Sequence, residues 1–104
     1  MILSHGTLTA PAAHADAIRQ MLGQIAQATR QETGCQLYLV SENLETPGHF
    51  IITEQWASME DMGAHLALPA VGEAVGEAVA AVHGMGVTDL TITAWEAGTQ
   101  TQVM

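Results

Sequence analysis

The chain has 104 residues, which fits one compact domain. Eleven acidic residues against Arg19 and Arg30, with no lysine, give a net charge of −9. This balance argues against nucleic acid or an anionic membrane surface as a partner, because both need a basic patch. It excludes Schiff-base catalysis by lysine and disfavours a phosphorylated substrate, which Arg or Lys usually holds.

The single cysteine, Cys35, cannot form an internal disulfide, which favours a reducing, cytoplasmic location. No apolar run nears eighteen residues and no signal peptide opens the chain, so we expect a soluble, unprocessed protein. The composition is 48% hydrophobic and only 12% charged. With so few charges, some apolar side chains should lie on the surface of the subunit. They could form an interface with a partner subunit or be scattered and exposed, and the composition leaves both possibilities open.

Residues 2–9 predict a first strand with one polar face. Pro11 then suits the first turn of a helix over 12–33, and Gly34 suits the residue just beyond its end. The helical spacing gives one apolar stripe, made of Ile18, Leu22, Ile25, Ala26 and Thr29.

Residues 35–43 and 49–56 predict the second and third strands, separated by turn residues 44–48. Strands so close in sequence should form an antiparallel pair. Ser58 and Asp61 then resemble a capping box that starts a second helix, with Met59, Met62 and Leu66 as its apolar stripe.

Pro69 breaks or kinks this second helix, and residues 70–83 continue as helix. Residues 87–95 predict the last strand, and 98–104 predict a loose tail after a single domain over 1–97. The order βαββαβ is typical of a ferredoxin-like α+β fold, an antiparallel sheet with helices on one face. Because strands two to four carry apolar residues on both faces, the other face should pack against a second copy, as in a dimeric α/β barrel.

Several short motifs, in order and spaced over about residues 5–95, resemble the antibiotic biosynthesis monooxygenase family, which includes quinol monooxygenases. The residues that carry this resemblance are Gly6 to Leu8, Pro11, Glu32, Gly34, Cys35, Tyr38, Glu54, Trp56, His65 and Pro69. The resemblance implies a homodimer with a pocket between the sheet and the helices of each subunit. It also implies oxygenation of a phenolic, quinol or anthrone-type substrate by molecular oxygen without metal, flavin or haem, so that no cofactor is expected.

Three departures from relatives bear on the activity that the resemblance implies. Polyketide-acting members carry Asn where this chain has Ile52, and an Arg that this chain lacks after Arg30. Haem-degrading relatives carry a His where this chain has Val75, which disfavours haem chemistry. A non-catalytic ligand-binding dimer, or an isomerase or lyase that uses the same pocket, remains an alternative to the monooxygenase.

Two residues are the candidate catalytic groups. Trp56 is either a core residue or an aromatic wall with its indole N–H aimed at a substrate oxygen. His65 lies at the edge of its helix's apolar stripe, where its imidazole could act as a general base near neutral pH. We expect both rings to face one shared pocket, with Met59 and Leu66 packed beneath it.

The candidate substrate-binding residues come from the strands. Tyr38 and Glu54 could bind substrate by their polar groups, although packing and a structural hydrogen bond are the simpler roles. His5, Asn43 and His49 lie on strands or strand ends from which they could reach a pocket. No two histidines have metal-ligand spacing, so no metal site is expected.

Overall fold

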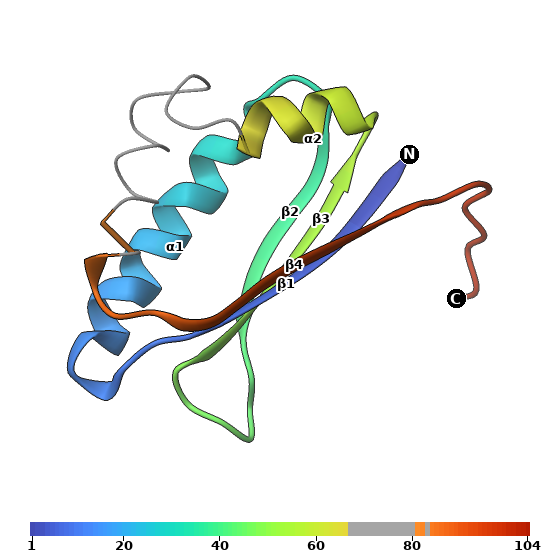
Figure 1. Cartoon of the computed structure of the whole chain (residues 1–104). Helices are drawn as coiled ribbons and strands as arrows, with labels where there is room; N and C mark the ends of the chain where they lie inside the picture. The colour runs from blue at the N-terminus through green and yellow to red at the C-terminus, as the bar shows by residue number, and fades with distance from the viewer. Residues whose placement is uncertain (67–80, 83) are drawn as a thin grey trace.

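Alternating burial along the strands shows how the sheet is built. Strand β1 (Ile2–Thr9) buries Ile2, Ser4 and Leu8 and exposes Leu3 and His5. The computed structural model describes residues 1–66, 81–82 and 84–104. Within these residues the sheet has four strands, and its buried face is covered by helices (Figure 1).

Strand β1 is central and pairs antiparallel with β3 (His49–Trp56) and with β4 (Thr88–Glu96). Strand β2 (Cys35–Glu42) pairs antiparallel with β3, so the order is β2-β3-β1-β4. Helices α1 (Ala15–Thr29) and α2 (Met59–Leu66) lie on the same side of this sheet (Figure 1). The predicted ferredoxin-like α+β fold is confirmed, and the first and third strands have their predicted bounds.

Helix α1 is shorter than predicted at both ends. Its expected first turn is a 3₁₀ helix, η1 (Ala12–His14), closed by a hydrogen bond from His14 N to Pro11 O of 2.9 Å. The helix ends at Thr29, after which Gln31 N and Glu32 N donate to Ala28 O and Thr29 O in the tighter i→i+3 pattern. The five residues of the predicted apolar stripe are all buried.

A bulge interrupts the pairing of β2 with β3. Cys35 pairs with Trp56 and Leu37 with Gln55, so β2 advances two residues while β3 advances one. Beyond the bulge Tyr38 lies opposite Glu54. As a result, Tyr38 is buried on the helix-covered face of the sheet.

Helix α2 begins as its capping residues predict. The Ser58 hydroxyl accepts a hydrogen bond from Asp61 N and donates one to the Asp61 carboxylate. The buried residues of α2 are Met62 and His65, whereas Met59 and Leu66 are 48% and 45% exposed. The expected stripe is therefore wrong in register, because a helix of two turns presents only one narrow face to the sheet.

Two predicted features follow α2 in the sequence: a further helical segment and a C-terminal tail. The predicted helix over 70–83 and the break at Pro69 lie outside the described residues, apart from residues 81 and 82. Residues 97–104 contain no helix or strand. None of the described helices has the length and apolar character needed to cross a membrane.

Candidate functional site

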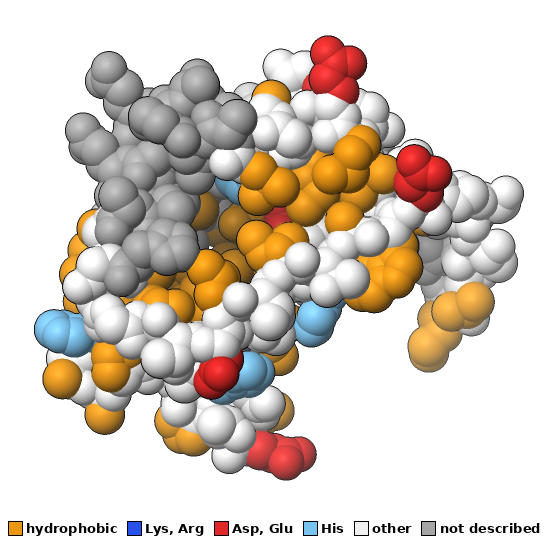
Figure 2. All heavy atoms as spheres, viewed as in Figure 1, with side chains coloured by type: hydrophobic (Ala, Val, Ile, Leu, Met, Phe, Trp, Pro, Cys, Tyr) orange, Lys and Arg blue, Asp and Glu red, His pale blue; other side chains and the backbone are white. Residues whose placement is uncertain are grey.

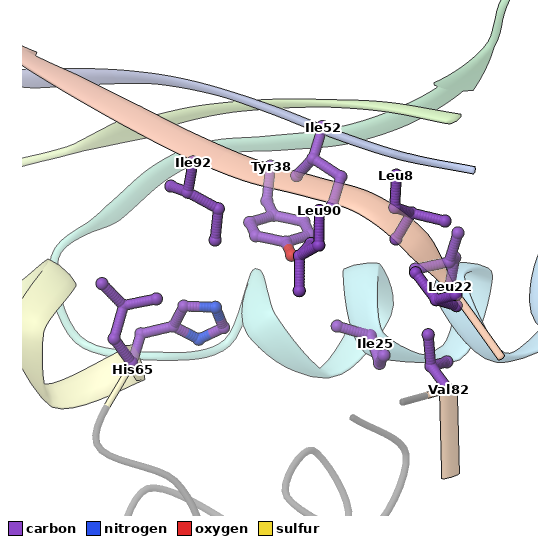
Figure 3. Close-up of a pocket in the computed structure, with 11 residues that line it drawn as sticks. Leu8, Leu22, Ile25, Tyr38, Ile52, His65, Val82, Leu90 and Ile92 are labelled. Carbon is purple, nitrogen blue, oxygen red and sulfur yellow. The ribbon is translucent and has the colours of Figure 1, made fainter. Parts of the chain in front are cut away.

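A largely apolar pocket lies between the sheet and the helices. Its volume is about 200 Å³. The described residues that line it are Leu8, Leu22, Ile25, Tyr38, Ile52, His65, Leu66, Val82, Val87, Leu90 and Ile92. Figure 2 shows a hollow among hydrophobic side chains with a histidine visible in it, and Figure 3 shows the lining residues. Tyr38 and His65 are the polar side chains among these described residues.

Close packing at the start of α2 places His65. The missing Cβ of Gly34, which has a φ of +80°, leaves the space that the Asp61 carboxylate fills. Ala57 N also donates to Gly34 O at 2.8 Å. The turn after α1 therefore lies directly against α2, so that Glu32 of that turn reaches His65, which lies about one helical turn beyond Asp61.

The His65 ring is held from three sides. Its Nδ1 lies 2.8 Å from Glu32 Oε2. The Trp56 ring packs against it at a tilt of 31° with centroids 5.1 Å apart, and Tyr38 meets it edge-on at 5.6 Å. Only 5% of His65 is exposed, and Figure 3 shows its ring directed into the pocket below Tyr38.

Trp56 is fully buried behind His65 and uses its polar atom internally. The indole N–H donates to Glu54 Oε1 at 3.0 Å, and the Ser4 hydroxyl donates to Glu54 Oε2 at 3.3 Å. Both donors reach Glu54 because Ser4 pairs with Glu54 across the strands and Trp56 lies two residues along the same face. Trp56 and Glu54 thus form a support behind His65, and the indole N–H is engaged by Glu54.

Tyr38 presents its hydroxyl to the pocket. Arg30 Nε donates to Tyr38 O at 2.9 Å, which fixes the backbone of β2 at this point. Burial, followed by the nearby carboxylates of Glu54 and Glu32, raises the pKa of Tyr38 well above that of a free tyrosine. The hydroxyl is therefore protonated and able to donate. Among the described residues it has no hydrogen-bond partner of its own.

Both arginines form hydrogen bonds outside the pocket. Arg19 forms paired hydrogen bonds of 2.9 Å with Glu42 and also contacts Asp16, while Arg30 binds the Tyr38 carbonyl. Neither lines the pocket. Within the described part of the chain, no cluster of three or more His, Cys, Asp or Glu side chains could hold a metal ion.

The structure separates the remaining candidate residues from the pocket. His5 is exposed on the opposite face of the sheet, and His49 on that face lies 3.3 Å from the Thr9 hydroxyl. Asn43 accepts a hydrogen bond from Glu45 N within the turn between β2 and β3. None of these three residues lines the pocket. Cys35 is partly buried, and burial raises the pKa of its thiol.

Sequence reasoning did not identify Glu32 as a partner of His65. In the sequence Glu32 stands out only through a short motif with Gly34 and Cys35. The contact joins residues 33 positions apart, and it depends on how closely α2 packs on the turn after α1. No periodicity or spacing in one sequence reports such a contact.

Comparison with known proteins defines the class to which this fold and pocket belong. The sequence profile of the antibiotic biosynthesis monooxygenase family matches residues 1–77, and the chain belongs to that family. The predicted resemblance is confirmed. A search of curated proteins found no match.

Solved structures agree with this assignment. A Deinococcus radiodurans protein, described as a "putative antibiotic biosynthesis monooxygenase", is 56% identical over 100% of this chain and 99% of its own, with a TM-score of 0.89. A structure described as an antibiotic biosynthesis monooxygenase is 21% identical over 95% of this chain and 100% of its own, with a TM-score of 0.82. A Mycobacterium tuberculosis protein is 20% identical over 98% of this chain and 100% of its own, with a TM-score of 0.76. The last two show the fold alone.

Proposed function

We propose that the protein is a cofactor-independent monooxygenase that oxidises a small, uncharged, electron-rich aromatic of the quinol, phenol or anthrone type with molecular oxygen. The observation that carries this proposal is the pairing of His65 and Tyr38 in an otherwise apolar pocket of about 200 Å³. Family membership supports the same reaction class.

The pocket favours a neutral substrate that becomes an anion only after it is bound. The described lining supplies no positive charge for a phosphate or carboxylate. An imidazole can take a proton from a substrate hydroxyl, and the protonated Tyr38 hydroxyl can donate to the oxygen on which charge develops. An apolar cavity of 150 Å³ holds a molecule the size of benzene, so about 200 Å³ suits a small substituted ring.

The chemistry balances without a further reductant. For a quinol, His65 removes the hydroxyl proton and the ring anion passes electrons to dioxygen. A carbon–oxygen bond then forms, giving a ring peroxide. The oxygen–oxygen bond breaks with the return of a proton, and loss of the ring hydrogen gives a hydroxyquinone and water. The substrate supplies all four electrons: one oxygen atom ends in the product and the other in water.

The proposed assembly is a homodimer formed through the uncovered sheet face. Leu3 and Trp95 are paired across β1 and β4 and are 40% and 55% exposed, and Leu39 on β2 is 49% exposed. Packing two such faces together would cover these side chains, and a stable interface of this kind buries about 800 Å² on each partner. We further propose a cytoplasmic location, on the basis of the free Cys35.

Oxygen uptake by metal-stripped, flavin-free protein tests the proposed reaction. We expect uptake with at least one compound from a panel of quinols, phenols and anthrones, and one atom of ¹⁸O₂ in the product. Saturable binding without uptake by any compound would instead identify a ligand-binding protein. Conversion of a compound under nitrogen without oxygen consumption would identify an isomerase or lyase.

A further inference from the structure

Among the described pairs of acidic and basic side chains in contact, Glu32 and His65 are the least exposed to solvent. The side chains are 13% and 6% exposed, and Nδ1 and Oε2 are 2.8 Å apart. A carboxylate can only accept hydrogen bonds, so the imidazole must donate from Nδ1. In a neutral imidazole a proton on Nδ1 leaves the lone pair on Nε2.

The second oxygen of this carboxylate is poorly satisfied. Glu32 Oε1 is buried and receives no hydrogen bond from any described residue. Buried polar atoms without a partner are rare and call for a reason. A carboxylate in this state draws most of its stabilisation from the one bond it accepts from His65, which strengthens that bond in a low-dielectric site.

The neighbours of His65 leave its ring little freedom to turn. Trp56 packs on one side and Tyr38 meets the ring edge-on. The other titratable groups close by are the Tyr38 hydroxyl and Glu54, whose carboxylate is held by Trp56 and Ser4. Of these groups, Glu32 is the one that contacts a ring nitrogen in the described structure.

We propose that Glu32 is a positioning residue, which fixes His65 as the Nδ1–H tautomer and so presents the Nε2 lone pair to the pocket. When Nε2 takes up a proton, the same carboxylate stabilises the imidazolium that forms. The kinetic part of this inference rests on the proposed function. The tautomer itself does not depend on any activity.

Nitrogen NMR of histidine-labelled protein tests the tautomer directly. At a pH at which the ring is neutral, we expect the His65 proton on Nδ1 in the wild-type protein. Glu32→Ala should remove this preference. Glu60→Gln is the matched control, because it removes one negative charge from an exposed position of α2, the helix that carries His65. It should leave the His65 signals unchanged.

Kinetics test the consequence for the base. Glu32→Gln keeps an acceptor of the same shape but loses the charge, so it also serves if the alanine variant does not fold. We expect its kcat to fall by about tenfold or more with KM changed by less than about twofold. The rising limb of its kcat profile should move to lower pH, because the imidazolium has lost its counter-charge. A purely structural role for Glu32 would not move this limb.

The outcomes separate this inference from the proposed function. Three results would each overturn the positioning role. The first is a His65 proton on Nε2 in the wild-type protein, and the second is an unchanged His65 tautomer in Glu32→Ala. The third is a pH profile of kcat in Glu32→Gln that matches that of the wild-type protein. If the wild-type protein consumes no oxygen with any compound of the panel, the proposed function fails. The NMR result then still decides whether Glu32 fixes the tautomer.

Discussion

The indole N–H of Trp56 donates to the buried carboxylate of Glu54 at 3.0 Å, and the same indole packs against the His65 ring. Trp56 therefore acts on the site through its neighbours. Trp56→Phe should leave Glu54 with one partner fewer and lower the free energy of unfolding by about 1–3 kcal/mol. Urea unfolding measures this loss. Leu44→Ala, at a fully exposed turn residue outside the proposed interface, should change it little.

His65→Gln removes the proposed base while keeping a side chain of similar size. Turnover should fall by roughly 10²-fold or more, with the fold and assembly intact. In the wild-type protein kcat/KM should rise with pH, because only the neutral ring can accept a proton. Oxygen uptake against pH measures both effects. His14→Gln, at an exposed position, is the control, and full uptake by His65→Gln would remove His65 from the mechanism.

Tyr38→Phe tests the proposed hydrogen bond to the substrate oxygen. A hydrogen bond to a charged group contributes about 1.5–3 kcal/mol, so kcat should fall by about tenfold or more. Because the pKa of Tyr38 is raised, its hydroxyl stays protonated above the range in which a free tyrosine ionises. The wild-type profile should thus show no fall due to this group up to about pH 10. A wild-type kcat in Tyr38→Phe would exclude the donor role.

Arg19 and Glu42 give a separate test at acid pH. Hydrogen bonds from Arg19 and then from Gly48 lower the pKa of Glu42 from 4.5 to about 2. A carboxyl group whose pKa is lowered in the folded protein stabilises the folded state at pH values above its ordinary pKa. This stabilisation is lost as pH falls from about 4.5 to about 2. Glu42→Gln should therefore be less stable than wild type at pH 7 and differ less from it at pH 2.

Thermal unfolding of both proteins across this range measures the difference. Glu45→Gln in the neighbouring turn removes an exposed carboxylate for which no partner is found among the described side chains. Its difference from wild type should not vary with pH. A constant difference for Glu42→Gln as well would show that Arg19 is not the cause.

Leu3→Glu tests the proposed dimer. A charge on the exposed face of the inner strand β1 should separate the subunits, since an unpaired charge in an interface is costly. Sedimentation at micromolar concentration should show a dimer for wild type and a monomer for the variant. Leu44→Glu, at a fully exposed turn residue, should remain dimeric. A wild-type monomer over the same concentrations would contradict the proposed assembly.

The strand bounds and the start of α2 followed closely from the sequence, whereas contacts between elements did not. Alternation fixed which residues of β1 and β3 face the helices, and Ser58 with Asp61 marked the start of α2. The burial of His65 in place of Leu66 depends on how α2 rotates over the sheet, which eight residues do not determine. The Glu32 contact likewise depends on the packing of one turn against one helix.

The bulge in β2 decides which face of the sheet Tyr38 occupies. Cys35 and Tyr38 are three residues apart, so regular alternation would send their side chains to opposite faces. The extra residue, Gln36, restores both to the side of the helices. Deletion of Gln36 should therefore be tolerated, because the shortened strand has Cys35 and Tyr38 two residues apart and on one face by regular alternation. A strand that kept Gln36 but paired without the bulge would instead point the tyrosine ring out of the pocket and bring a leucine in.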